Sequence, residues 1–109
     1  MMNLEQIAMI MISKAGEGRA LSMEAIECAK DGDFIKAEEC LNKSNECLQA
    51  GHKANAELLW AEAQDKDMKI SILLIHAQDH IMDAMTVREM AEQMVALYRK
   101  IEENNKEVS

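Results

Sequence analysis

Residues that interrupt helices or favour strands are scarce in this chain. Its 109 residues include no proline and four glycines, and aromatic residues make up 3%. Proteins built from many short strands need proline and glycine as breakers and are enriched in aromatic residues. Hydrophobic residues reach 49% and charged residues 29%, the balance of a folded chain. Because 109 residues are too few for two ordinary domains, we expect one all-α domain over residues 1–109.

Positive charge and long apolar runs are also lacking. Twelve basic residues face 20 acidic ones, giving a formal net charge of -8, which repels phosphate backbones and argues against nucleic acid as a partner. No apolar run approaches the ~20 residues that span a bilayer. Glu5 precedes the apolar residues 7–12, where a signal peptide would carry basic residues. We therefore expect a cytoplasmic protein with no direct membrane insertion.

The cysteines do not form a recognisable spacing motif. Cys28, Cys40 and Cys47 are odd in number and show no CxxC pair, so the sequence indicates neither a disulfide framework nor a zinc knuckle. We expect them to act as small apolar residues on helices.

Hydrophobic periodicity predicts three helices, at about residues 3–31, 33–64 and 68–103, packed as an antiparallel three-helix bundle. Gly32 is expected to end the first helix in a left-handed conformation, and Asp33 to cap the second. The charged residues 65–67 are expected to link the second and third helices, and the polar tail after Glu102 to fray. The predicted buried stripe of the third helix comprises Ile70, Leu73, Leu74, Ala77, Ile81, Ala84, Met85, Ala91, Met94, Val95, Tyr98 and Ile101.

The third helix carries a further row of apolar residues, which we call the second apolar stripe: Ile72, Ile75, Met82, Met90 and Leu97. A lone three-helix bundle would leave this stripe in water, so self-association into a cyclic homo-oligomer is one interpretation. Asp79 lies within the stripe. At an oligomer axis its copies would converge and share a hard cation, by preference Mg²⁺. The alternative is a solvated edge on which the apolar residues have no partner.

His76, Gln78, Asp79 and His80 place several polar groups on little more than one helical turn. His76 and His80 project from one side of the helix with Asp79 close by, whereas Gln78 points elsewhere. Three interpretations compete. His76 is a nucleophile that accepts a phosphoryl group while His80 donates to its oxygens. Alternatively, His76, Asp79 and His80 form a metal site. Their spacing resembles the HExxH zinc motif, but without its glutamate base and without the ligand that a distant part of the chain supplies there. Otherwise they are half-exposed histidines without chemistry.

Two glycines lie inside the otherwise regular first helix. Gly16 and Gly18 each cost about 1 kcal/mol relative to alanine, so they are expected to permit close approach to a neighbouring helix or a phosphate. Arg19 offers a positive charge to such a phosphate, although a surface position is the commoner one for arginine. The remaining histidine, His52, is expected on the surface.

Four blocks carry a family resemblance, over about residues 4–98. They are ISILLIHAQDHIM at 70–82, AMTVREM at 84–90, GRALSMEA at 18–25 and AKDGDFIKAE at 29–38, of which the first is the most specific. With these blocks the chain resembles the lactose/cellobiose-type IIA component of the bacterial phosphoenolpyruvate-dependent sugar phosphotransferase system.

This resemblance implies a homotrimer of three-helix subunits with His76 as the phosphorylated histidine, modified by family habit at Nε2. It implies a divalent cation, Mg²⁺, held on the trimer axis by Asp79 of each subunit. His76 would receive its phosphoryl group from HPr and pass it to a cysteine of the IIB component during uptake of a disaccharide of cellobiose, diacetylchitobiose or lactose type. Gln78, which also matches the motif, is expected to reach the pocket of a neighbouring subunit.

The chain departs from the family pattern at two places. A block that often reads His-x-x-Gln-Thr here has Asn55 and Ala56 at its last two positions, and Asp83 stands where threonine or serine is common. The alternative function is a non-catalytic helical adaptor, because residues 29–48 have the rhythm of a tetratricopeptide-type hairpin. Only one such hairpin is present, whereas at least three repeats are normally needed.

Overall fold

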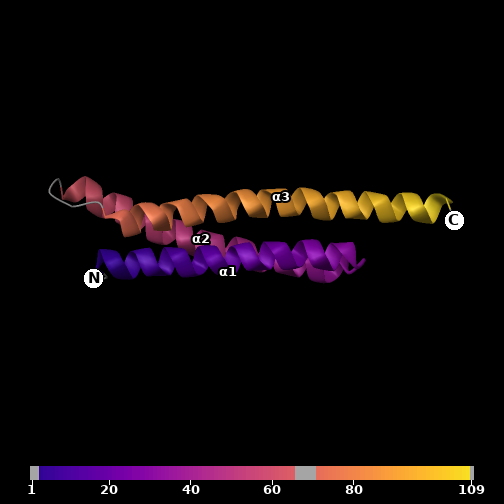
Figure 1. Cartoon of the computed structure of the whole chain (residues 1–109), viewed down its shortest axis with the longest axis horizontal. Coiled ribbons are helices and arrows are strands. Elements are labelled where there is room, and N and C mark those ends of the chain that lie inside the picture. The colour runs from indigo at the N-terminus through magenta and orange to yellow at the C-terminus, as the bar shows by residue number, and fades with distance from the viewer. Residues whose placement is uncertain (1–2, 66–70, 109) are drawn as a thin grey trace.

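Three long helices make up the computed structural model, which describes residues 3–65 and 71–108. They are α1 (Leu4–Lys30), α2 (Phe34–Gln64) and α3 (Ile72–Val108). Helices α1 and α3 run in the same direction with α2 antiparallel to both, giving a rod of 66 × 18 × 17 Å (Figure 1). The described residues contain no strand, which confirms the all-α prediction. None of their helices combines the length and apolarity needed to span a membrane.

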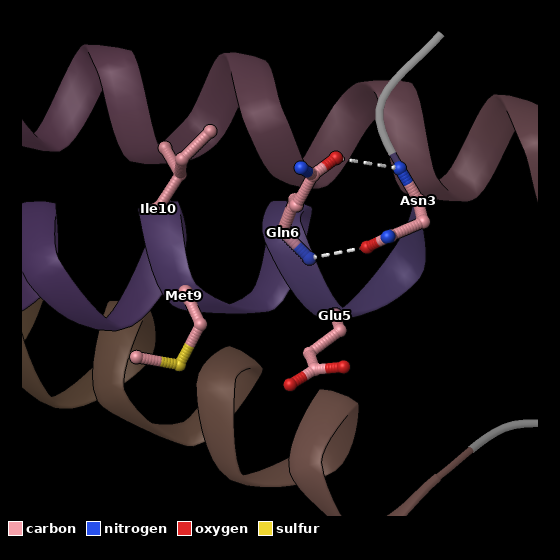
Figure 2. Close-up of a pocket in the computed structure, with 5 residues that line it drawn as sticks. All are labelled: Asn3, Glu5, Gln6, Met9 and Ile10. Atoms are coloured by element: carbon pink, nitrogen blue, oxygen red, sulfur yellow. Dashed lines mark hydrogen bonds between the residues drawn. The ribbon is translucent and has the colours of Figure 1, made fainter.

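The start of α1 is fixed by a capping box. The side-chain oxygen of Asn3 accepts a hydrogen bond from the Gln6 backbone N–H at 2.8 Å, and the Gln6 side-chain oxygen accepts one from the Asn3 N–H at 3.1 Å (Figure 2). Each side chain thus satisfies a backbone donor that the helix end leaves without a partner.

The turn between α1 and α2 is the predicted one. Gly32 has a φ of +84°, the left-handed region that glycine adopts without a steric penalty. Its N–H donates to the carbonyl of Ala29 at 3.0 Å. Asp33 then caps α2, since its side chain accepts from the Lys36 N–H at 3.1 Å. The turn is therefore short, and α2 folds back directly along α1.

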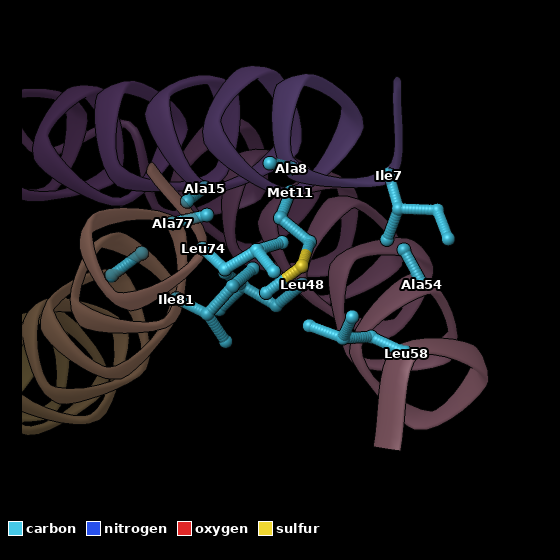
Figure 3. Close-up of a cluster of buried hydrophobic side chains, with 11 residues drawn as sticks. Ile7, Ala8, Met11, Ala15, Leu48, Ala54, Leu58, Leu74, Ala77 and Ile81 are labelled. Carbon is cyan, nitrogen blue, oxygen red and sulfur yellow. The ribbon is translucent and has the colours of Figure 1, made fainter. Parts of the chain in front are cut away.

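Two clusters of buried side chains hold the rod together. The first joins the start of α1, the second half of α2 and the start of α3; it contains Ile7, Ala8, Met11, Ala15, Leu48, Ala54, Leu58, Leu74, Ala77, Ile81 and Ala84 (Figure 3). The second lies nearer the α1–α2 turn and contains Ala25, Ala29, Ala37, Cys40, Leu41, Ala91 and Val95. All the α3 residues of the two clusters fall on the predicted buried stripe of the third helix.

Two details of the third helix were predicted wrongly. Its C-terminal part does not fray: α3 continues to Val108 and extends past the α1–α2 turn (Figure 1), supported by an ion pair between Glu102 and Lys106 at 3.8 Å. Met94 and Ile101 are exposed instead of buried. They lie three and four positions from Leu97 and so share its exposed side.

Some predictions fall on residues 66–70, outside the described part of the chain. They concern Ile70, most of the predicted 65–67 link and the expected start of the third helix near residue 68.

Helices α1 and α2 approach each other closely at Gly18. A Cβ atom at this position would lie 3.0 Å from the Leu48 side chain and 3.4 Å from the Ser44 carbonyl oxygen. The buried Ser44 hydroxyl donates to the Gly18 carbonyl at 2.7 Å, and the Ser22 and Ser44 hydroxyls are 2.8 Å apart. This confirms close helix approach at Gly18. A Cβ at Gly16 would meet no atom within 4 Å, so Gly16 has no such role.

The two glycines therefore form a matched pair for a stability measurement. Gly18→Val is expected to destabilise the fold by about 1–3 kcal/mol, because the branched side chain overpacks the α1–α2 contact. Gly16→Val is expected to be neutral or slightly stabilising, because valine has the higher helix propensity and open space around it. Thermal unfolding followed by circular dichroism measures both, and equal midpoints would contradict the packing role of Gly18.

Candidate functional site

His76 and His80 form a close pair on the surface of α3. The helix places residues four positions apart on one face, so the two rings lie one turn apart. Their Nε2 atoms are 3.0 Å apart, and the rings meet edge to face with centroids 4.4 Å apart and planes at 84°. His76 is exposed and His80 is half-buried. Of the two imidazoles, His76 is thus the more accessible to another protein.

The 3.0 Å separation constrains the protons of the pair. A nitrogen-to-nitrogen hydrogen bond needs one donor and one acceptor, so in the neutral pair one Nε2 is protonated and the other presents its lone pair. When His80 donates, the proton of His76 is on Nδ1 and its Nε2 is a nucleophile. The arrangement therefore supplies an accessible nucleophilic nitrogen with an N–H donor beside it.

Gln78 faces a different helix. Two residues along an α-helix are rotated by about 200°, so Gln78 projects away from His76. Its side-chain N–H donates to the Asn55 side-chain oxygen on α2 at 3.2 Å. In the single chain Gln78 therefore bonds to Asn55, a residue at which this sequence departs from the family pattern. Its contact with a neighbouring subunit stays a prediction. This bond gives the half-buried Gln78 amide a hydrogen-bond partner, as buried polar groups in proteins normally have.

Asp79 lies on the opposite edge of the site, within the second apolar stripe. The five stripe residues are between 51% and 86% exposed, and Asp79 is exposed as well. No ion pair of Asp79 is found within residues 3–65 and 71–108. One face of α3 therefore combines a carboxylate with a row of aliphatic and methionine side chains that nothing in the single chain covers.

A single-chain metal site at the histidines is not supported. Across the described residues, one group of three metal-ligating side chains converges, and it consists of Glu24, Cys28 and Cys40. His76, Asp79 and His80 do not meet this condition, because Asp79 points toward the second apolar stripe whereas the histidines face each other.

Arg19 pairs with a residue on the histidine side of α3. Its Nε lies 3.4 Å from the Asp83 carboxylate, and both side chains are 58% exposed. Asp83 lies three residues beyond His80, so this pair stands beside the histidines. Such an exposed ion pair contributes little to stability, which leaves Arg19 free to exchange partners. His52 is exposed on α2, as expected.

The hollow described in the structure lies away from the histidines. A shallow hollow of about 410 Å³ lies over the first turns of α1 and is lined by Asn3, Glu5, Gln6, Met9 and Ile10 (Figure 2). None of the histidine-site residues contributes to it. An exposed imidazole on a convex helix suits contact with another macromolecule better than enclosure of a small molecule.

Three features of the surface were missed by the sequence interpretation. The Gln78–Asn55 bond and the Arg19–Asp83 pair each join two helices, and the Glu24, Cys28 and Cys40 cluster spans the α1–α2 turn. For the Glu24, Cys28 and Cys40 cluster, the sequence offered one signal: Glu24 and Cys28 are four positions apart and so share one face of α1.

Comparison with known proteins gives one consistent result. Residues 6–99 match the family described as "PTS system, Lactose/Cellobiose specific IIA subunit". The lichenan-specific phosphotransferase enzyme IIA component of Bacillus subtilis is 42% identical over 100 residues, covering 92% of this chain and 91% of that protein.

Two solved structures show the same arrangement of helices. The cellobiose-specific enzyme IIA from Bacillus anthracis superimposes with a TM-score of 0.86 at 41% identity, over 94% of each chain. The IIA(Chitobiose) protein of Escherichia coli, solved in complex with HPr, gives a TM-score of 0.83 at 32% identity, over 94% of this chain and 99% of that one.

The histidine pair predicts a tautomer change. In His80→Asn the donor to His76 Nε2 is lost, so the fraction of His76 that carries its proton on Nε2 is expected to rise. Long-range proton–nitrogen correlation spectra of the imidazoles, recorded where both rings are neutral, measure this fraction. His52→Asn is the control and should leave it unchanged. An unaltered His76 spectrum in His80→Asn would show that the 3.0 Å contact does not set the tautomer.

Proposed function

Because the chain belongs to the family of lactose/cellobiose-specific IIA subunits of the phosphotransferase system, we propose that it is a phosphocarrier whose His76 relays a phosphoryl group. The donor is phospho-HPr and the acceptor is the cysteine of a IIB component. The relay serves uptake of a disaccharide of cellobiose, diacetylchitobiose or lactose type. HPr enters as donor because the E. coli relative was solved in complex with it.

The exposed His76 beside His80 is the observation that carries this proposal. A phosphoryl acceptor needs an unprotonated nitrogen open to an approaching protein. When His80 is the donor of the 3.0 Å contact, that nitrogen is Nε2 of the exposed His76, and its lone pair is released for attack once the His80 N–H turns away from it. After transfer, the same N–H is close enough to donate to a phosphoryl oxygen. A hydrogen bond to such a charged group contributes about 1.5–3 kcal/mol.

Each transfer exchanges one bond to phosphorus for another. The phosphorus–nitrogen bond of the donor phosphohistidine breaks as the bond to His76 Nε2 forms. That bond then breaks as the IIB thiolate forms a phosphorus–sulfur bond. No electrons are gained or lost. In-line positioning and charge stabilisation supply most of the catalysis in such reactions. Arg19, whose Nε lies 3.4 Å from Asp83, offers a positive charge on the histidine side of α3.

The second apolar stripe supports assembly as a homotrimer. Burying an aliphatic side chain is worth about 1.5–3 kcal/mol, and the stripe runs along most of α3. Three copies packed through this face would cover one another's stripes around a common axis. His76 stands at the rim of the face and stays accessible to HPr and IIB.

A trimer of this kind brings three copies of Asp79 together. Carboxylate oxygens are the ligands that Mg²⁺ prefers, so the donor set fits a hard divalent cation. Asp79 of each subunit would hold the ion, whose charge would offset the repulsion among the carboxylates. This role concerns assembly and leaves the phosphoryl step to the histidines.

The adaptor alternative has less support. The α1–α2 hairpin is packed along its length by α3 and is not followed by another hairpin in the described residues. Stacked repeats require such neighbours.

Phosphoryl labelling tests the relay. Incubation with phosphoenolpyruvate, enzyme I and HPr is expected to add an acid-labile, base-stable phosphoryl group to the chain. His76→Ala should abolish this mass gain, because it removes the more exposed imidazole of the pair, while the helical signal stays intact. His52→Ala is the matched control and should retain the label. Mass spectrometry of the intact protein measures all three. A label that persists in His76→Ala would refute the assignment.

Assembly is tested separately at the second apolar stripe. Asp79→Leu removes the repulsion among three carboxylates and is expected to keep or strengthen the trimer without added metal. Ile75→Glu places a charge in the stripe and is expected to yield monomers, whereas Ile35→Glu alters an exposed isoleucine on α2 and should leave the mass unchanged. Light scattering reports whether the particle has the 12.3 kDa mass of one chain or three times that value. A monomeric Asp79→Leu protein would contradict the axial role.

A further inference from the structure

A second group of reactive side chains lies beside the α1–α2 turn, away from the histidines. The Cys28 and Cys40 sulfur atoms and a Glu24 carboxylate oxygen all lie within 4.8 Å of one another. Glu24 and Cys28 occupy successive turns on one face of α1, and Cys40 reaches them from α2. Because Glu24 and Cys40 are each eight positions from Gly32, the hairpin places them at the same level.

Packing fixes two of the three side chains. Cys40 belongs to the second buried cluster and is 5% exposed, and Cys28 packs against that cluster half-buried. Glu24 is exposed, and its carboxylate forms the outer side of the group. The cluster is thus held by the hairpin on its inner side and open to solvent at Glu24.

We propose that Glu24, Cys28 and Cys40 form a binding site for a zinc ion. Two sulfur ligands and one carboxylate, with water as the fourth ligand, make a tetrahedral set that suits Zn²⁺ and disfavours Mg²⁺. With zinc–sulfur bonds of about 2.3 Å, tetrahedral geometry puts the two sulfur atoms roughly 3.8 Å apart. The two sulfur atoms, at most 4.8 Å apart at present, therefore need to approach by no more than about 1 Å.

Binding exchanges protons for the metal. Burial raises the pKa of the Cys40 thiol, and the nearby Glu24 and Cys28 raise it further while Lys36 lowers it. The empty site accordingly holds Cys40 as a thiol, and zinc binding releases the protons of both cysteines to solvent. Lys36, whose Nζ is 3.9 Å from a Glu24 oxygen, must also give up that ion pair. Proton release and loss of the ion pair both oppose binding. The free energy gained from the zinc–thiolate bonds must therefore be larger than the free energy of these two processes.

The site is remote from the phosphoryl relay. Cys40 packs with Ala91 of α3, whereas His76 precedes Ala77 in the first cluster. Ala77 and Ala91 are fourteen residues apart on α3, which corresponds to about 21 Å along the helix axis. A zinc ion at this distance takes no part in phosphoryl transfer. It links α1 to α2 beside their turn, and its expected effect is on the stability of the hairpin.

Titration of the full-length, phosphine-reduced protein with cobalt chloride and then zinc chloride tests the site. Cobalt is expected to bind at one equivalent per chain with a thiolate-to-cobalt charge-transfer band in the near ultraviolet, and zinc should displace it. Cys28→Ala and Cys40→Ala should lose the band. Glu24→Gln should weaken metal binding by at least about tenfold, because mutating residues that only hydrogen-bond to a metal ligand already reduces metal affinity by that factor.

Matched controls separate this site from other thiols and imidazoles. Cys47→Ala removes the third cysteine, which is also buried on α2 and contacts Glu17 but belongs to no group of three metal-ligating side chains among residues 3–65 and 71–108. It should retain the band, as should His76→Ala. Circular dichroism verifies that each variant is folded. If Cys40→Ala does not fold, Cys28→Ala and Glu24→Gln still test the site, because Cys28 is half-buried and Glu24 is exposed. Absence of stoichiometric binding, a spectrum without the charge-transfer band, or an unchanged titration in Cys28→Ala would overturn the proposal.

Discussion

Helix α3 has apolar residues on more than one side, and this constraint governs the rest of the structure. One side, with Leu74, Ala77 and Ile81, closes the core formed by α1 and α2. Another side carries the second apolar stripe, which the single chain leaves exposed. The free energy of burying that stripe is comparable to the stability of a small domain. His76 and His80 lie between these two apolar sides.

The histidine site follows from this arrangement. His76 and His80 stand between the core side and the exposed stripe, on a helix held rigidly by α1 and α2 over much of its length. Neither imidazole needs a loop to position it, because successive turns of one helix fix the 3.0 Å contact. An interaction between two rings on a rigid helix is preserved when partners of different shape dock beside it.

The sequence was sufficient to predict features that depend on one helix at a time. The faces of α1, α2 and α3, the left-handed Gly32 and the Asp33 cap all follow from local periodicity and turn chemistry. The resemblance of the residues around His76 led to the family that the comparisons show.

Features that join two helices were beyond the same reasoning. Whether Gln78 meets Asn55, and whether Cys40 meets Cys28, depends on the rotation and axial level of packed helices, which periodicity does not fix. The length of α3 was misjudged for a different reason. A polar tail without a buried face was expected to fray, yet the Glu102–Lys106 pair stabilises continued helix there.

The order of the helices also bears on how the chain is made. Contacts of α1 with α3 join segments that are far apart in the sequence, as in the cluster that contains Ile7, Met11, Leu74 and Ile81. While α3 is still in the ribosome, the nascent α1–α2 hairpin has no partner for its apolar side and remains open to chaperones. The core closes late in translation, through contacts of high sequence separation that slow folding.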